Sequence, residues 1–245
     1  MPNTYFRFRQ FIVHQQHTAM KVSTDACLFG ALVARDLHTL IEADQKGKRA
    51  LDIGSGTALL TLMIAQQHDF YFDTIEIDPD AYEQGRSNVE GSPWSKKIRC
   101  HQGNLNDFAP AAAYQVLICN PPFFAQQLPS PDAQRNRARH DEELTLVQLL
   151  DFARKYLSEE GVLFLLMPAA RETQVVREAE RRGFSLGRKY DISHSSAHPV
   201  TRHVWAWSKK RRIVEQARLF MRDANNRPSP EFSALLDPYY LPSGD

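Results

Sequence analysis

The 245-residue chain has few cysteines, no long hydrophobic run and almost no net charge. Its three cysteines, Cys27, Cys100 and Cys119, are far apart and match the spacing of neither a zinc site nor a disulfide framework. The longest apolar run, residues 162–167, is far shorter than the roughly 20 residues of a membrane-spanning helix. Residues 1–10 lack the apolar core of a secretory signal. We therefore expect a protein of the reducing cytoplasm that does not enter a membrane.

The net charge of +1 conceals an uneven distribution. Residues 171–218 contain twelve lysines or arginines but only five acidic residues. A basic segment on a nearly neutral protein favours contact with a polyanion such as nucleic acid, although solvated helices and loops also carry such runs. The same two interpretations apply to Arg135, Arg137 and Arg139. The sequence gives no indication of the oligomeric state.

Short apolar segments alternate with amphipathic ones through the middle of the chain. This order is typical of an α/β fold with a mostly parallel sheet and helices on both faces. The predicted strands are residues 49–53, 71–77, 98–101, 115–119 and 162–167. The predicted helices are residues 25–40, 146–157 (ended by Gly161) and 171–182 (ended by Gly183). Residues 184–190 and 203–207 are predicted to form an antiparallel terminal hairpin.

This pattern divides the chain into three parts. Residues 1–48 form an N-terminal extension, residues 49–212 the α/β domain, and residues 213–245 a C-terminal tail that packs on the core. The tail contains four prolines, and its apolar side chains suit docking against the domain.

Two glycines separate a predicted strand from a predicted helix in Asp52-Ile53-Gly54-Ser55-Gly56. Glycine permits a tight turn and keeps a Cβ out of the path of a ligand, and the next helix offers free N–H groups. Glu76, twenty residues after Gly56, lies at the end of the next strand. A carboxylate there can accept hydrogen bonds from both hydroxyls of a ribose. The pattern indicates a cofactor that contains a nucleoside.

The identity of the cofactor follows from departures from the dinucleotide-binding fingerprint. That fingerprint requires a third glycine where this chain has Leu59. Asp52 would repel a pyrophosphate, but it suits the ammonium and sulfonium groups of S-adenosylmethionine. Asn104 follows the third strand, where it either binds an adenine edge through its amide or serves as a turn residue. Leu105 can cover the face of that adenine.

The motif Asn120-Pro121-Pro122-Phe123 ends the fourth predicted strand, which is expected beside the first. An exocyclic amine of adenine is a poor nucleophile because its lone pair is delocalised into the ring. The Asn120 side-chain oxygen and the Pro121 carbonyl can accept its two hydrogens and localise the lone pair. The two prolines, Pro121 and Pro122, stiffen the loop. Phe123 offers a flat face for stacking an extruded base, worth about 1–3 kcal/mol.

The glycine turn, Glu76 and the Asn120–Phe123 motif resemble those of class I S-adenosylmethionine-dependent methyltransferases that act on amino or amide nitrogen. Within this superfamily, the whole chain resembles the bacterial tRNA1(Val) (adenine-N6)-methyltransferases, which modify adenine 37, just 3′ of the anticodon. The closer similarity is carried by residues 6–11, 19–25, 139–140 and 233–241.

The resemblance implies a Rossmann-like, seven-stranded sheet whose last strand is antiparallel. It also implies a role for each motif residue. Asp52, Gly54 and Gly56 would lie at the methionine end of the cofactor, Glu76 at its ribose and Asn104 near its adenine. Asn120 would hold the target amine, and Phe123 would stack the base. Residues 1–48 would form a cofactor lid and substrate contact, with residues 21–25 closing over the cofactor and Thr24 near its carboxylate.

Two positions depart from the family pattern. Ala58 stands where the glycine motif has its third small residue, and Asn104 stands where many relatives have aspartate.

Other functions use a similar amide-binding loop. A glutamine-amide methyltransferase acting on a release factor or ribosomal protein is one alternative, although the 48 leading residues leave little room for the extra helical domain of those enzymes. A guanine-N2 methyltransferase acting on ribosomal RNA is another. A non-enzymatic cofactor sensor is disfavoured by the intact Asn120–Phe123 motif. A DNA adenine methyltransferase is disfavoured because the chain has no sizeable insertion for target recognition. We expect no metal site, because the pairs His14/His17 and His194/His198 have no third ligand nearby.

Overall fold

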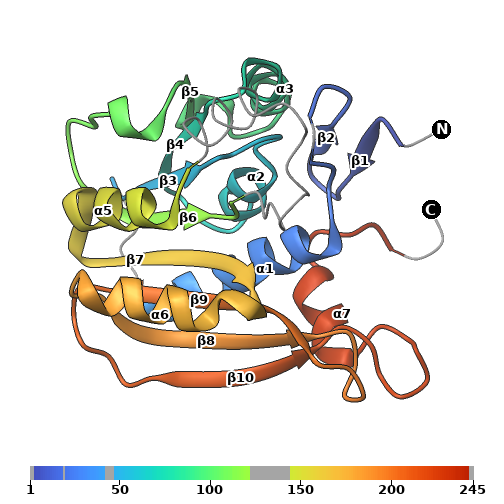
Figure 1. Ribbon diagram of the computed structural model, residues 1–245. Helices are drawn as coiled ribbons and strands as arrows, with labels where there is room; N and C mark the ends of the chain where they lie inside the picture. Colours follow the sequence, from blue (N-terminus) through green and yellow to red (C-terminus); the bar gives the residue numbers. More distant parts are fainter. Residues whose placement is uncertain (1–2, 19, 42–46, 122–143, 243–245) are drawn as a thin grey trace, which may run out of the picture.

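The computed structural model describes residues 3–18, 20–41, 47–121 and 144–242 (Figure 1). These residues form a small hairpin and a central sheet of eight strands in the order β10-β8-β9-β7-β6-β3-β4-β5. The hairpin pairs β1 (Tyr5–Arg7) with β2 (Ile12–His14). The strands of the central sheet are β3 (Arg49–Ile53), β4 (Tyr71–Glu76), β5 (Ile98–Gln102), β6 (Tyr114–Cys119), β7 (Leu157–Pro168), β8 (Ser185–Ser193), β9 (Val200–Ser208) and β10 (Glu215–Phe220).

The direction of these strands creates one functional edge. Strand β9 is antiparallel to β7 and β8, whereas the other pairs in the sheet are parallel. The parallel strands therefore all end at the same edge, and β9 begins there, since Val200 pairs with Ser193. We call this the carboxyl edge, and we call the edge where the parallel strands begin the amino edge. In an open α/β sheet, ligands bind outside the carboxyl ends of the strands.

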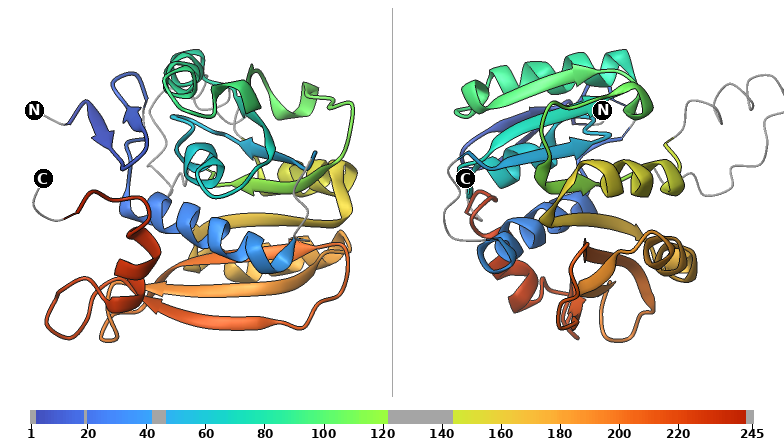
Figure 2. Two further views of the ribbon diagram at one scale, coloured as in Figure 1. Left: turned by 180° about the vertical axis from the view of Figure 1, so that it is seen from behind. Right: turned by 90° about the vertical axis from the view of Figure 1, so that its left-hand side faces the viewer.

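Helices cover both faces of the sheet (Figure 2). One hydrophobic core lies between the sheet and α1, α2 and α7, and the other lies under α5 and α6. Along β6, Val116 and Ile118 belong to the first core, whereas Leu117 and Cys119 belong to the second. The helices are α1 (Thr24–Leu40), α2 (Leu59–Ala65), α3 (Pro79–Glu90), α5 (Leu146–Tyr156), α6 (Glu172–Arg181) and α7 (Pro230–Leu236), with 3-10 turns η1 (Ser95–Lys97), η2 (Leu105–Asp107) and η3 (Ala169–Arg171).

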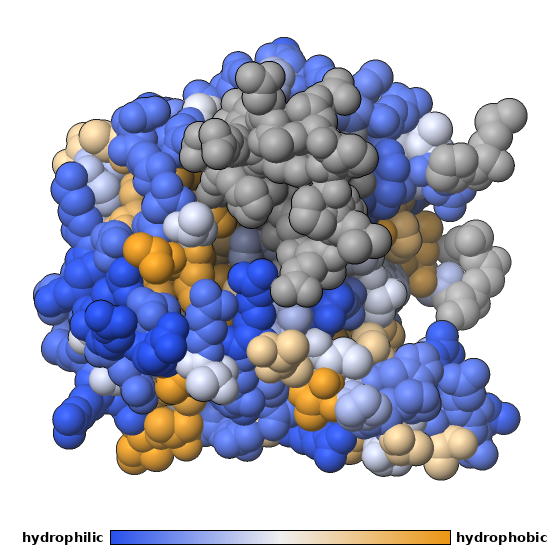
Figure 3. Space-filling model, in the orientation of Figure 1, coloured by the Kyte–Doolittle hydropathy of each residue, from blue (hydrophilic) through white to orange (hydrophobic). Residues whose placement is uncertain are grey.

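Burial on two faces explains the apolar runs of the central strands. The outer surface drawn in Figure 3 is mostly hydrophilic, with small separate hydrophobic areas. None of the helices in the described ranges has the length and apolar character needed to cross a membrane.

The predicted fold class is confirmed: the sheet is mostly parallel, helices cover both faces, and β8 and β9 form the expected antiparallel hairpin. The sheet has one strand more than the seven expected, because residues 215–220 pair in parallel with β8. This strand has no alternating apolar pattern, since Leu219 is its one buried residue. Later in the same segment, Leu235, Leu236 and Tyr239 are buried in the core.

The prediction that Gly161 ends a helix is wrong. Helix α5 ends at Tyr156, and β7 begins at the next residue, so Gly161 lies inside a strand. Leu157 is extended and buried, and it pairs with Tyr114 of β6. The tertiary contact therefore stops the helix at Tyr156, five residues before the glycine.

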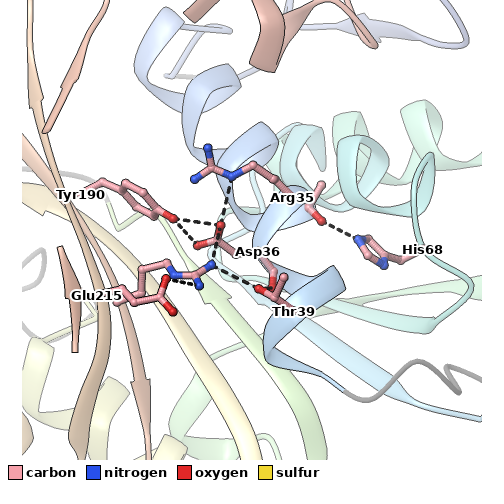
Figure 4. A network of polar contacts seen from close by, with 8 residues as sticks. Arg35, Asp36, Thr39, His68, Tyr190 and Glu215 are labelled. Atoms are coloured by element: carbon pink, nitrogen blue, oxygen red, sulfur yellow. Dashed lines mark hydrogen bonds and ion pairs between the residues drawn. The ribbon is translucent and has the colours of Figure 1, made fainter. Parts of the chain in front are cut away.

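A buried carboxylate fastens α1 to the sheet (Figure 4). Asp36 is 1% exposed, and both of its oxygens accept from the Tyr190 hydroxyl at 2.9 Å. The guanidinium groups of Arg188 and Arg35 lie 3.0 and 3.2 Å from Oδ1. Burial raises the pKa of the Asp36 carboxyl, and these partners oppose the shift. Breaking such a network by removing one partner leaves a buried charge less well compensated.

We expect Tyr190→Phe to lower the free energy of unfolding by about 1–3 kcal/mol, because the buried Asp36 carboxylate loses the hydrogen bonds from the Tyr190 hydroxyl. Urea unfolding followed by circular dichroism measures the change. Tyr71→Phe is the control, because Tyr71 is 57% exposed. Equal stability of the two variants would contradict the role given to the network.

Candidate active site

The register of three strands brings the two predicted motifs together. Ile53 of β3 pairs with Cys119 of β6 on one side and with Ile75 of β4 on the other. Neighbouring strands are about 4.8 Å apart. The glycine turn that begins at Gly54 and the motif that begins at Asn120 therefore leave adjacent strands at the same level of the carboxyl edge.

The glycine turn has the backbone conformation that its sequence requires. Gly54 and Gly56 have φ values of 68° and 52°, and Ala58, just before α2, has φ 61°. A side chain at the two glycines would be strained in this left-handed region, which Ala58 also occupies. The N–H groups of Gly54 and Ser55 donate to the Ile75 carbonyl at 2.9 and 3.2 Å, so the turn is fixed to β4.

Glu76 is held in place by two backbone donors. Its Oε2 accepts from the Gly56 N–H at 2.8 Å, and its Oε1 accepts from the Asp78 N–H at 3.0 Å. Each carboxylate oxygen can accept a further hydrogen bond. Glu76, the residue predicted to bind the ribose, is thus oriented by the turn itself. Both of its oxygens can still accept a hydrogen bond.

Asp52 lies beneath the turn, only 1% exposed. Its Oδ2 accepts from the Thr61 hydroxyl of α2 at 2.8 Å, whereas its buried Oδ1 has no hydrogen-bond partner among the described residues. Burial raises the pKa of this carboxyl to about 7, the Thr61 hydrogen bond opposes the shift, and the Glu76 charge adds to it. A buried carboxylate oxygen without a hydrogen-bond partner among the described residues, such as Asp52 Oδ1, suits a ligand with a cationic group.

A pocket opens beside the turn, at the ends of β3, β4 and β5. Gly54, Ile77, Asn104 and Leu105 are among its lining residues. The Asn104 side-chain oxygen accepts from the Asn106 N–H at 2.9 Å and so caps η2, which is the turn role that the sequence left open. Ile77 is 42% exposed and, with Leu105, offers an apolar surface to a flat ring. Together with Glu76 and Asp52, the pocket fits the adenine, ribose and ammonium of S-adenosylmethionine.

Asn120 stands at the carboxyl end of β6 with its side chain half buried. Its Oδ1 is buried and accepts no hydrogen bond from the described residues. A buried amide oxygen without a donor costs free energy, so such an atom marks a place where a ligand donor would be stabilised. Pro121 is also half buried. Pro122, Phe123 and the three arginines 135, 137 and 139 lie outside the described residues.

Thr24 is exposed in the first turn of α1, which Ser23 caps through the Ala26 N–H. The neighbouring Asp25 lies 3.2 Å from Arg202 at the start of β9, so this end of α1 lies at the carboxyl edge. The role of Thr24 near the cofactor carboxylate stays a prediction.

Two residues that support the glycine turn, Gly85 and Asn88, were not predicted from the sequence. A Cβ on Gly85 of α3 would lie 2.5 Å from the Gly56 carbonyl oxygen, so α3 packs directly against the glycine turn. The Asn88 side chain, one turn later, donates to the carbonyls of Thr57 and His14 at 3.0 and 2.9 Å. It thereby joins the turn to the N-terminal hairpin. A glycine inside a helix costs about 1 kcal/mol relative to alanine, which could have flagged Gly85 as a close-packing position.

The described residues contain no group of three side chains that could hold a metal ion. Buried Cys119 lies next to the site, but burial and the charges of Asp52 and Glu76 raise the pKa of its thiol. A nucleophilic thiolate is therefore not available there.

Comparison with known sequences identifies close relatives. The model of the methyltransferase small domain family matches residues 32–179. A protein from Tolumonas auensis named tRNA1(Val) (adenine(37)-N6)-methyltransferase is 36% identical over 96% of each chain. Proteins of the same name from Parabacteroides distasonis and Klebsiella pneumoniae are 33% and 34% identical, each over 98% of this chain and over 99% and 96% of their own.

Comparison with solved structures identifies the fold. A protein from Agrobacterium tumefaciens described as a predicted O-methyltransferase gives a TM-score of 0.65 at 16% identity, covering 87% of this chain and 96% of its own. The glycopeptide N-methyltransferase MtfA, solved with S-adenosylmethionine, gives 0.54 at 13% identity, covering 74% and 94%. The sheet and its helices are those of the Rossmann-like methyltransferases.

We expect Gly85→Ala to weaken the binding of S-adenosylhomocysteine about tenfold or more, because the new methyl group must displace the Gly56 carbonyl. Isothermal titration calorimetry measures the dissociation constant. Gly91→Ala, in which the nearest atom to the new Cβ is 3.5 Å away, is the control and should bind normally. Unchanged affinity in Gly85→Ala would show that the turn tolerates displacement.

We expect the affinity for S-adenosylhomocysteine to fall about tenfold between pH 8 and pH 6, relative to Asp52→Asn. The pKa of Asp52 is about 7 in the free protein, and protonation removes the charge that a ligand ammonium requires. The same carboxyl affects stability. Since the pKa of Asp52 is higher in the folded than in the unfolded protein, the free energy of unfolding without ligand falls as the pH rises from about 4 to 7. Parallel pH profiles of the two proteins would exclude Asp52 from cofactor binding.

Proposed function

Because this chain belongs to the family of tRNA1(Val) (adenine(37)-N6)-methyltransferases, we propose that it methylates the N6 amine of adenine 37 in tRNA1(Val). The methyl donor is S-adenosylmethionine. The observation that carries the proposal is the buried, unpartnered Oδ1 of Asn120, one strand away from the glycine turn. It is an acceptor aimed at an N–H donor that the described part of the chain does not provide.

The chemistry requires positioning more than proton transfer. S-adenosylmethionine supplies a methyl group activated by its bond to a sulfonium. Asn120 Oδ1 and the Pro121 carbonyl accept the two hydrogens of the amine, which turns the nitrogen lone pair away from the ring. The N–C bond would form as the S–C bond of the donor breaks and S-adenosylhomocysteine leaves, and the methylated nitrogen, now acidic, would lose its proton to water without a strong base. Preorganised dipoles of this kind contribute a large part of many rate enhancements.

The N-terminal extension is fixed beside this site. In its hairpin region, the N–H groups of His14 and Gln16 donate to the side chains of Asn88 and Gln84 at 2.9 and 3.1 Å. These contacts support a role for residues 1–48 as cofactor lid and substrate contact, with Thr24 near the cofactor carboxylate.

The proposed substrate is the anticodon stem-loop of the tRNA, and the proposed location of the reaction is the cytoplasm. Bases of such a loop are partly unstacked, so extruding adenine costs less free energy there than in a duplex. Phe123 is proposed to stack the extruded base.

We expect Asn120→Ala to lower kcat on the order of 100- to 1000-fold while the dissociation constant of S-adenosylhomocysteine changes less than about twofold. The assay follows labelled methyl groups into separate pools of tRNA, ribosomal RNA, DNA and release factor, and digestion of labelled tRNA should give N6-methyladenosine. Tyr71→Phe, an exposed residue at the start of β4, is the control and should keep full activity. Normal turnover by Asn120→Ala would remove this residue from the mechanism, and label in another pool would change the substrate.

A further inference from the structure

The fold separates the basic segment 171–218 into two groups at opposite edges of the sheet. Arg171 follows the end of β7, and Arg218 lies near the end of β10, so both are on the side of the carboxyl edge. Strand β9 runs the other way and ends at Ser208, which carries residues 209–212 to the amino edge. A run that looks continuous in the sequence is therefore not one surface.

The cations toward the amino edge are largely paired with carboxylates. Lys209 lies 3.2 Å from Glu159, and Lys210 pairs with Glu160 at the start of β7. In the same half of the molecule, Arg182 bonds Asp151 and Glu178, and Arg188 bonds Asp36 and Glu215. Most of this charge is neutralised within the protein, so little is left to attract a polyanion.

Near the carboxyl edge, Arg202 pairs with Asp25 at 3.2 Å, but four other arginines lack such neutralisation. Arg171, Arg218, Arg222 and Arg227 have no carboxylate within ion-pair distance in the parts of the chain that the structure describes. Arg218 instead donates to the His198 carbonyl at 3.2 Å and lies over the Phe220 ring. Contacts with neutral groups orient a guanidinium but leave its charge available to phosphate, which it can bind through two N–H groups.

The turn after β10 is shaped to present this charge. Arg222 donates to the Asn226 carbonyl at 2.7 Å, and its backbone N–H bonds the His194 carbonyl of the loop after β8. The two loops consequently lie together at the lower right of Figure 1. Asp223, the acidic residue of the turn, accepts the N–H groups of Asn225 and Arg227 at 2.8 and 2.9 Å. Its carboxylate is engaged in holding the turn and does not pair with the arginines.

The position of these arginines relative to Asn120 matches a large substrate. Strand β7 is the neighbour of β6, and β10 is four strands from it. At about 4.8 Å for each strand, the strands that lead to these arginines lie about 5 to 19 Å from the strand of Asn120, measured across the sheet. That reach exceeds a single nucleotide and suits several phosphates of a nucleic acid backbone.

We propose that Arg171, Arg218, Arg222 and Arg227, here called the arginine surface, hold the phosphate backbone of the RNA whose adenine enters the site at Asn120. The proposal rests on the proposed function for the identity of the RNA. It assigns no role in RNA binding to the cations of residues 209–212. Backbone contacts of this kind set position and affinity and carry no sequence information.

The test compares two variants that lose the same charge. One is the triple variant Arg171→Gln, Arg218→Gln and Arg227→Gln, and the matched control is Arg181→Gln, Lys210→Gln and Arg211→Gln; all six side chains are exposed. Fluorescence anisotropy measures the dissociation constant for the unmodified tRNA over a series of salt concentrations. Thermal unfolding checks that both variants are folded.

In the arginine-surface variant we expect the slope of log affinity against log salt to decrease in magnitude by about 2–3 and the KM for tRNA to rise about tenfold or more, with kcat at saturating tRNA nearly unchanged. The control should match the wild type in both. Equal losses in the two variants, or no loss in the first, would overturn the proposal. Since the anisotropy measurement needs no methyl transfer, an RNA-binding protein with the expected slopes but no methylation would refute the proposed function alone.

Discussion

The parallel pairing of β3 with β4 and β6 is the constraint on which the site depends. Each strand ends at the same edge, and the pairings Ile53–Ile75 and Ile53–Cys119 fix which residues emerge together. The glycine turn, the Glu76 carboxylate and the amide motif come from segments up to about seventy residues apart, and the register alone makes them neighbours. A slip of one residue would send each side chain to the opposite face of the sheet.

Around this edge, the protein organises polar groups before any ligand is bound. Glu76 is oriented by the Gly56 N–H, and Asp52 is oriented by Thr61 and buried beneath the turn. Two acceptors, Asp52 Oδ1 and Asn120 Oδ1, are buried without donors among the described residues. Such groups cost stability in the free protein, and a ligand with N–H donors removes that cost. Both atoms therefore suit the proposed ligands, the cationic group of the cofactor at Asp52 and the target amine at Asn120.

Much of this could be predicted from the sequence, because the information was local. Apolar runs of strand length, glycines with positive φ and an Asn-Pro-Pro stop each reflect the conformation of a few adjacent residues. Strand β3 was predicted with its observed bounds, Arg49–Ile53. What the sequence could not give depends on distant partners. Leu157 ends α5 because it pairs with Tyr114, β10 forms against β8 with one buried residue, and Gly85 is needed because α3 meets Gly56. The distribution of the basic residues over two edges likewise follows from the direction of β9, which residue composition does not encode.

The most direct measurement is a crystal structure of the protein with S-adenosylhomocysteine and an anticodon stem-loop that contains adenine 37. The account predicts that the adenine N6 lies within about 2.7–3.2 Å of Asn120 Oδ1, on the side of the motif that faces the sulfur of the cofactor. An adenine bound elsewhere, or an Asn120 oxygen that is hydrogen-bonded inside the protein and turned away from the base, would contradict it.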